Sequence, residues 1–181
     1  MNFRIIRCES VDLDRFVSFW AELYRDPLEP LYEENIAGPL TPARIRKLFE
    51  WKNGGKLARK KMESVERNFI GRLDEALNLD PDTPAHDFLK LWPKGGAIWR
   101  IFWLHCWTPD RYPIFDQHVY RAAARICGWA DRKIPTTDGK RIDAYLQRYL
   151  PFWRDIGISS RDADRALWVY GRFLKQWCSS A

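Results

Sequence analysis

Apolar residues recur at helical rather than strand spacing along nearly all of this chain, and this pattern limits the fold more than any other feature. They form one face of residues 11–25, and a longer stripe covers residues 163–177. The tetrapeptide RIIR at 4–7 is the only segment that resembles a strand. The chain is therefore predicted to be all-α, with seven or eight helices.

Capping residues, prolines and glycines divide this pattern into segments. Helices are predicted over residues 11–25 with Ser10 as the cap, from Thr41 through Trp51, over 56–79, from Thr83 to Trp92, over 97–107, from Asp116 to Gly128, from Ile142 to Pro151, and onward from Ser159 or Ser160. The proline-rich residues 26–40 are expected to form a loop or two short turns. Gly171, in the middle of the last helix, is expected to let another backbone approach closely.

The size and charge of the chain narrow the class of protein. Its 181 residues, 46% of them hydrophobic, suit one compact domain. The formal net charge of +6 has the sign expected of a protein that binds nucleic acid, although many other proteins carry such a charge. No apolar run approaches the roughly 20 residues that span a membrane. Because the N-terminal residues do not resemble a secretion signal, a cytoplasmic location is expected.

Cysteine and histidine spacing argues against metal and disulfide sites. The cysteines at 8, 106, 127 and 178 include no CxxC pair, so they are interpreted as reduced thiols rather than a disulfide framework or an iron–sulfur site. His86, His105 and His118 lack the close spacing of zinc ligands. No metal site is predicted.

One segment of the sequence places a carboxylate, Asp116, where it could take part in catalysis. A short helix, the turn Pro93–Gly96, an apolar helix and a second turn are followed by Asp116 at a predicted helix start. Glycines in a turn between helices let backbone N–H groups approach a phosphate. A carboxylate at a helix start is held ionised by free N–H groups and by the helix dipole. Near bound DNA, such an anion can stabilise a sugar cation or activate water.

Residues 84–128 resemble the core of the helix-hairpin-helix base-excision DNA glycosylases, the superfamily that includes endonuclease III and the oxoguanine glycosylases. The match consists of LWPKGG at 91–96, in the position of the hairpin, and PIFDQHVYR at 113–121, in the position of the aspartate motif. The late segment DADRALWVYGRFL at 162–174 resembles the final helix of that family. The resemblance implies one domain of two helical lobes, 1–55 with 135–181 and 56–134.

The resemblance assigns roles to individual residues. Asp116 falls on the catalytic aspartate, and His118 is interpreted as a packing or capping residue. The positions that contact DNA are Lys94, Gly95, Gly96 and Arg121. Residues that line the base pocket or wedge into the duplex are expected at Trp51, Lys52, Asn53 and Phe115.

The resemblance also implies a partner and a reaction. The partner is duplex DNA, bound by a monomer without a membrane. No organic cofactor is needed, although the family allows a monovalent cation at the hairpin. Bifunctional members carry a lysine just after the hairpin, which attacks the sugar, and in this chain Ala97 or a neighbour occupies that region. The implied activity is therefore that of a monofunctional DNA N-glycosylase, which removes a damaged or modified base.

Departures from the family pattern leave alternatives open. Pro93-Lys94 replaces the usual glycine-valine of the hairpin, and Phe115 is an extra residue before the aspartate. Asp116 could serve only as a helix cap. The chain would then be a non-catalytic DNA-binding module with the same fold, or a helical interaction protein without a nucleic-acid partner.

Overall fold

The computed structural model describes residues 12–157 and 160–177, and these residues form helices joined by turns and loops. The all-α prediction is confirmed for this part of the chain. The helices are α1 (Leu13–Glu22), α2 (Glu29–Ile36), α3 (Pro42–Lys52), α4 (Arg59–Asn68), η1 (Ile70–Arg72), α5 (Leu73–Leu77), α6 (Ala85–Leu91), α7 (Ala97–Trp107), α8 (Gln117–Ile126), α9 (Asp138–Ala144), η2 (Tyr145–Tyr149), α10 (Leu150–Asp155) and α11 (Arg161–Trp177).

Side-chain caps fix several helix starts. Thr41 accepts a hydrogen bond from the Arg44 N–H at 3.3 Å, which confirms the predicted start of α3. Asp12 caps α1 by accepting from the Arg15 N–H at 2.9 Å. The expected cap of that helix, Ser10, lies outside the described residues, as do the RIIR segment, Ser159, Cys8 and Cys178.

Three boundaries differ from the predictions, each for a local reason. The expected loop at 26–40 contains α2, since Pro30 lies in its first turn, where a missing N–H costs nothing. Pro151 lies in the first turn of α10, so it begins this helix and does not end the preceding one. The predicted helix 56–79 is interrupted at Phe69, whose φ of −122° is not helical and whose ring stacks on Phe49 at 4.8 Å.

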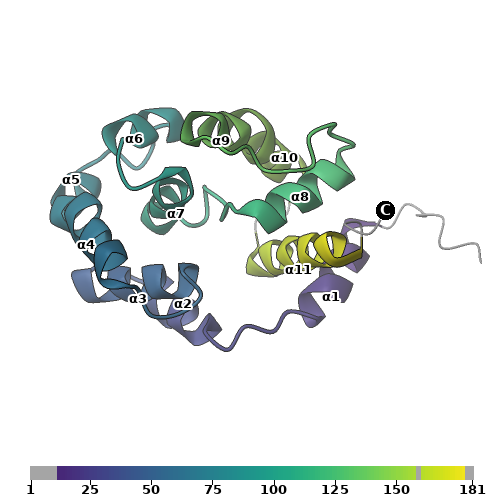
Figure 1. Ribbon diagram of the computed structural model, residues 1–181, viewed down its shortest axis with the longest axis horizontal. Helices are drawn as coiled ribbons and strands as arrows, with labels where there is room; N and C mark the ends of the chain where they lie inside the picture. Colours follow the sequence, from purple (N-terminus) through teal and green to yellow (C-terminus); the bar gives the residue numbers. More distant parts are fainter. Residues whose placement is uncertain (1–11, 158–159, 178–181) are drawn as a thin grey trace, which may run out of the picture.

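The apolar helix α7 forms the centre of the core. In Figure 1 it lies inside the arc formed by α3, α4, α5, α6 and α9. Trp103 is fully buried, while Trp107 is partly buried and donates its indole N–H to the Ala76 carbonyl at 2.9 Å. Trp99 packs against Phe49 at 5.3 Å. The tryptophans of this helix therefore pack in the core, and buried residues from Tyr32 to Leu167 join one continuous hydrophobic cluster.

The C-terminal helix α11 packs against α1 and α8, as Figure 1 shows. A Cβ atom on Gly171 would lie 2.0 Å from the His118 carbonyl oxygen, so only glycine permits this contact. Arg121 donates to the Gly171 carbonyl across the same contact at 2.9 Å. The close approach expected at Gly171 is confirmed, and it fixes α11 beside the start of α8.

Within residues 12–157 and 160–177, no helix combines the length and the apolar character that a bilayer span requires.

Candidate active site

Asp116 is the N-cap of α8. Its Oδ1 atom accepts hydrogen bonds from the backbone N–H groups of His118 at 2.7 Å and Val119 at 3.2 Å. These donors lie at the positive end of the helix dipole, and they hold the carboxylate in place. The side chain is 21% exposed, so solvent or a ligand can reach it. Capping occupies Oδ1 and leaves Oδ2 for a different partner.

That partner is Lys52, the last residue of α3. Its Nζ atom lies 3.6 Å from Oδ2 of Asp116, and its side chain is only 7% exposed. The aromatic rings of Trp51 and Phe102 lie 5.9 and 5.6 Å from the ammonium. An almost buried cation requires a nearby anion, and Asp116 supplies one. The two residues therefore form an ion pair at the junction of two helices.

A second carboxylate, Asp164 on α11, lies near this pair and is buried. Burial raises the pKa of Asp164 to about 6; the cations Arg161 and Lys52 act in the opposite direction, and the Asp116 charge raises the pKa further. Its Oδ2 atom accepts from Arg161, whereas Oδ1 has no hydrogen-bond partner among the described residues. The charges of Asp164 and Asp116 also act on the buried Tyr149 hydroxyl, which likewise lacks a described partner. Buried polar groups without partners are rare and often mark functional sites.

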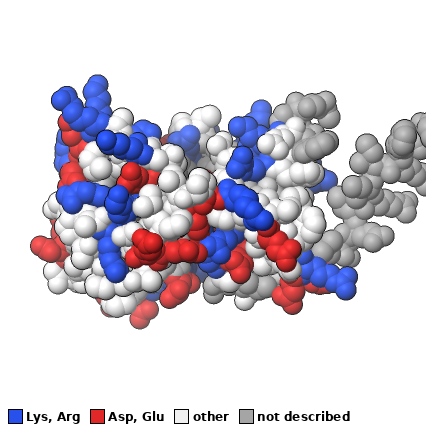
Figure 2. All heavy atoms as spheres, turned by 90° about the horizontal axis from the view of Figure 1, so that it is seen from below, with Lys and Arg blue, Asp and Glu red and all other residues white. Residues whose placement is uncertain are grey.

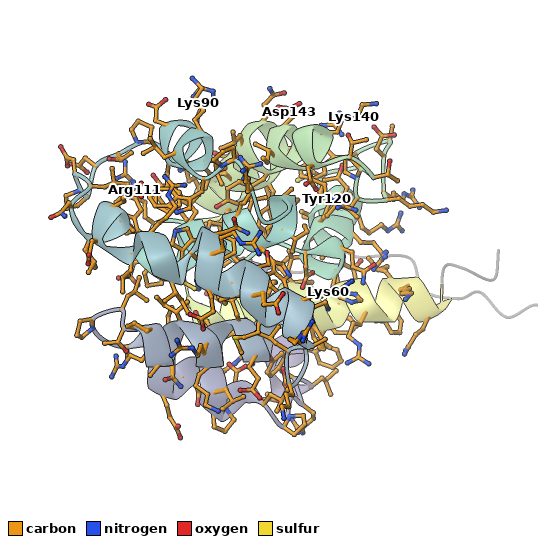
Figure 3. All side chains as sticks on the ribbon, turned by 60° about the vertical axis from the view of Figure 1, so that its left-hand side comes forward. Lys60, Lys90, Arg111, Tyr120, Lys140 and Asp143 are labelled. Atoms are coloured by element: carbon orange, nitrogen blue, oxygen red, sulfur yellow. The ribbon has the colours of Figure 1, made fainter. Side chains whose placement is uncertain are left out.

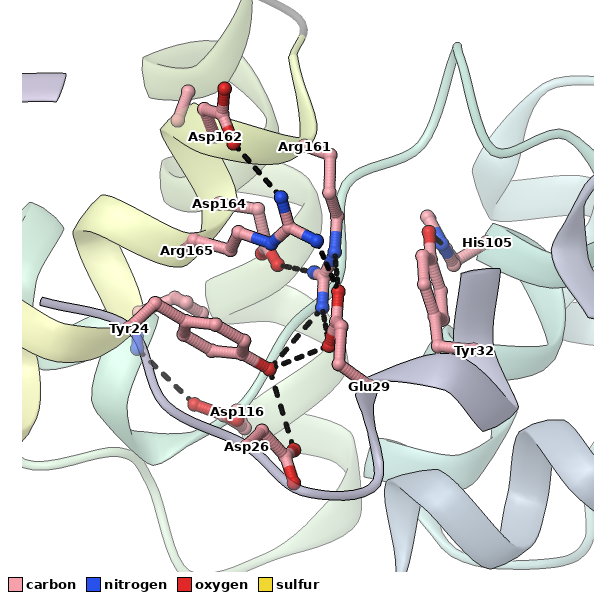
Figure 4. Close-up of polar contacts among 12 residues, drawn as sticks. Tyr24, Asp26, Glu29, Tyr32, His105, Asp116, Arg161, Asp162, Asp164 and Arg165 are labelled. Carbon is pink, nitrogen blue, oxygen red and sulfur yellow. Dashed lines mark hydrogen bonds and ion pairs between the residues drawn. The ribbon is translucent and has the colours of Figure 1, made fainter. Parts of the chain in front are cut away.

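The guanidinium of Arg161 joins α11 to the N-terminal helices. It donates to Glu29 in α2 through Nε at 2.9 Å and Nη2 at 2.8 Å, and it pairs with Asp164. Figure 4 shows the two carboxylates gathered around this guanidinium, with Tyr24 donating to Glu29 at 2.7 Å. Burial acts to raise the pKa of Glu29, but the bonds from Arg161 outweigh it and lower that pKa. Arg161 also lies over the Tyr32 ring at 4.3 Å, so its position is fixed from several sides.

Tyr32 and His105 form a buried polar chain. The Tyr32 hydroxyl lies 2.8 Å from Nε2 of His105, and Nδ1 lies 2.6 Å from the Tyr112 carbonyl. Burial lowers the pKa of His105 to about 3, so the ring is neutral at pH 7. Because the carbonyl can only accept, Nδ1 carries the proton, and Nε2 accepts from Tyr32.

A cavity of about 110 Å³ opens beside these groups. It is lined by Tyr32, His105, Pro109, Asp110, Pro113, Ile114, Trp153, Ser160, Arg161 and Asp164. Ile114 precedes Asp116 by two residues, so their Cα atoms are at most about 7 Å apart. Asp116 is not among the lining residues, but the cavity wall and the cap of α8 belong to one short segment.

The predicted DNA-binding hairpin lies between α6 and α7. Gly95 and Gly96 have φ values of +106° and +82°, which favour glycine. A Cβ on Gly95 would lie 2.7 Å from Cζ of Phe69, so that residue also permits close packing. Gly96 is the N-cap of α7, and no described side chain caps this helix. The first N–H groups of α7 therefore have no side-chain cap, and Lys94 is exposed in the turn that precedes them.

The other predicted site residues occupy different environments. Trp51 is 9% exposed beside Lys52, and Asn53 caps α3 and donates to the Gly55 carbonyl at 2.9 Å. Arg121 is half-buried and bonded to α11, so it stabilises the helix contact. Phe115 is fully buried against the Tyr145 and Tyr149 rings. Its side chain packs in the core, and we do not retain it as a pocket or wedge residue.

Most of the buried polar network was not predicted from the sequence: Glu29, Tyr32, His105, Arg161 and Asp164. Two weak signals were present. One was a histidine inside the apolar segment 97–107, and the other was the charged start of the helix stripe at 161–165. Neither signal shows which groups meet, because the network joins α2, α7 and α11.

No metal-binding group emerges within the described ranges: no set of three or more His, Cys, Asp or Glu side chains there could hold an ion. The two cysteines in these ranges, Cys106 and Cys127, are free. Comparisons with protein-family models, with curated proteins and with solved structures find no match to this chain. The functional interpretation therefore rests on the geometry of its own residues.

Proposed function

We propose that this protein is a monofunctional DNA N-glycosylase that removes a damaged or modified base from duplex DNA. The observation that carries the proposal is the environment of Asp116. Its carboxylate is partly exposed, is fixed by two backbone donors, and has an ammonium 3.6 Å from its second oxygen. Such an anion is positioned for charge stabilisation without reorganisation during the reaction.

Asp116 would act on the sugar. As the N-glycosidic bond lengthens, positive charge develops at the anomeric carbon, and a fixed carboxylate stabilises that charge. Asp116 then orients the water that attacks this carbon and accepts a proton from it. Asp116 and Asp164 are neighbouring carboxylates, and their negative charges would repel one another. The positive charge of Lys52 reduces this repulsion.

The hairpin would hold the DNA backbone. Its free N–H groups and Lys94 suit a phosphate contact that carries no sequence information. Lys90 on α6 and Lys140 on α9 project outward from helices that pack against α7, as Figure 3 shows. On the face seen in Figure 2, basic and acidic side chains are interspersed, so this face presents no uniform charge. The reaction needs no organic cofactor, and a monovalent cation at the hairpin is part of the proposal.

The test is base release from duplexes that each carry one lesion. Asp116→Asn keeps the cap of α8 and removes the charge, so release should fall by about 10²-fold or more while the helical circular dichroism is unchanged. Asp12→Asn is the matched control, because Asp12 caps α1 in the same way. Equal activity of wild type and Asp116→Asn would remove the proposed role of Asp116.

A second candidate function is a non-catalytic DNA-binding module. It is favoured by the altered hairpin, with Pro93-Lys94, and by Lys52, whose buried side chain neutralises Asp116. Salt-dependent binding of undamaged duplex without base release from any lesion would favour this function over the enzyme. Failure to bind DNA at low salt would exclude both.

A further inference from the structure

We propose that Asp164 is the general acid of the reaction, which protonates the departing base within the cavity that this residue lines. This inference rests on the proposed glycosylase function and adds a second catalytic residue. It also specifies the class of base: neutral bases, which leave readily only when a proton is supplied to a ring atom.

Asp164 and Asp116 are neighbouring carboxylates in contrasting environments. Asp116 is partly exposed, accepts from two backbone N–H groups and has the Lys52 ammonium 3.6 Å from its second oxygen. Asp164 is buried, and one of its oxygens has no described donor. When two acids in one site have environments that favour opposite protonation states, they can divide the roles of acid and anion.

Several charged groups surround the buried Asp164. A pKa of about 6 is high for a carboxyl group, so a fraction of the molecules keeps the proton near neutral pH. Burial is the main cause, and it outweighs the attraction of the nearby cations. The charged or titratable groups that act on Asp164, or on which it acts, are Glu29 and Tyr32 on α2, Lys52 on α3, Asp116 at the start of α8, Tyr149 on η2 and Arg161 on α11.

Asp164 lines a small cavity. Its volume of about 110 Å³ is a few times the roughly 30 Å³ occupied by a water molecule, which suits a small planar ring. Pro109, Pro113, Ile114 and Trp153 supply apolar walls. Asp164 lines the same cavity with a side chain that is 10% exposed, so a ring held there would lie beside this residue.

The bond between the base nitrogen and the anomeric carbon breaks, and its electron pair stays on the base. The Asp164 carboxyl group gives its proton to a ring atom of the base, which leaves as a neutral molecule. Water bonds to the anomeric carbon and gives one proton to Asp116. Exchange with solvent then returns the proton to Asp164, so the net reaction is hydrolysis.

The substitution Asp164→Asn tests the proposal, because it preserves shape and removes the acid. On a neutral lesion such as hypoxanthine, uracil or 8-oxoguanine, the single-turnover rate at pH 7 should fall by about 10²-fold or more. The rate of the wild type should decrease as pH rises above about 6, and the variant should lose this dependence. On 7-methylguanine, which is already cationic in DNA, the variant should keep its rate within about threefold.

The matched control is Asp162→Asn, on the same helix, where the side chain is 61% exposed and paired with Arg165. Its rates should equal those of the wild type on both classes of base. If Asp164→Asn lowers the rate of release equally for neutral and cationic bases, the role of Asp164 is merely structural and the proposal is overturned. Release of cationic bases alone by the wild type would also overturn it.

A second measurement does not depend on any variant. Carboxyl ¹³C NMR of the wild type should show an aspartate that titrates near pH 6. A protein in which every aspartate titrates below pH 5 has no proton to give, and the proposal fails even if the glycosylase function stands. If Asp116→Asn abolishes base release and Asp164→Asn leaves it intact, the glycosylase function also stands and the proposed role of Asp164 fails. No release by the wild type from any lesion would overturn both functions.

Discussion

The ammonium of Lys52 and the carboxylate of Asp116 lie 3.6 Å apart, although one ends α3 and the other begins α8. Each helix contributes the charge that its own dipole favours: a cation at a C-terminus and an anion at an N-terminus. The pair joins the N-terminal part of the chain to the proposed catalytic segment. The first prediction concerns the loss of the Lys52 charge from this pair.

Lys52→Met should remove a positive charge that acts on Asp164. The pKa of Asp164 should then rise above about 6, because Lys52 lowers that pKa in the wild type. Carboxyl NMR titration measures the shift.

Since the proposed enzyme is monofunctional, wild-type protein mixed with lesion DNA and borohydride should form no covalent complex. A trapped complex that Lys52→Met abolishes would instead make Lys52 a nucleophile.

Gly171→Ala should destabilise the fold by about 1–3 kcal/mol. The added methyl group would meet the His118 carbonyl oxygen, which is backbone and cannot move aside without separating α8 from α11. Gly139→Ala is the control, because a Cβ at this position in α9 meets nothing within 4 Å. That change should stabilise the protein by up to about 1 kcal/mol through helix propensity. Urea unfolding of both variants measures the two effects.

Two substitutions in the hairpin should have different effects: one should change DNA binding, and the other should change stability. Lys94→Ala should leave the unfolding free energy unchanged, and it should reduce the slope of log affinity against log salt by about 1. Gly95→Ala should lower stability, because the new Cβ would meet the Phe69 ring at a positive φ. Binding isotherms at several salt concentrations measure the slope. An unchanged slope in Lys94→Ala would place the DNA contact elsewhere.

The stability of the wild type relative to Asp164→Asn should depend on pH. The folded pKa of Asp164, about 6, lies above the usual value near 3.9, so the folded state binds a proton that the unfolded state has lost. The corresponding stability is present below about pH 4 and disappears as pH rises through 6. The difference in unfolding free energy should thus change by at most about 1.4 kcal/mol per pH unit in this range. A flat difference would mean that Asp164 is ionised throughout.

His105 gives the opposite pH dependence. Its folded pKa of about 3 lies below the usual 6.5, so the unfolded state binds the extra proton between these values. Stability should therefore fall as pH is lowered from about 6.5. Urea unfolding of the wild type and of His105→Gln over this range checks the sign, because the variant should lack this part of the acid destabilisation.

The sequence by itself determined the helical character of the chain, the apolar helix α7, the glycine turn at 95–96 and the placement of Asp116 at a helix start. Each of these depends on local rules: the period of apolar residues, the backbone freedom of glycine and the preference of aspartate for the N-cap. The extra helix α2 and the interruption at Phe69 were not predictable in this way. The first is a short helix in a proline-rich segment, and the second accompanies packing against Phe49.

Only the tertiary structure decided which charges share a site. Lys52, Asp116 and Asp164 are far apart in the sequence, and a lysine or aspartate on a helix is usually solvated. In the folded chain Lys52 and Asp164 are both buried and close enough to interact electrostatically, and Asp116 stays partly exposed. Burial and neighbouring charge set the protonation state of a carboxyl group, and both depend on residues that meet only in the folded chain.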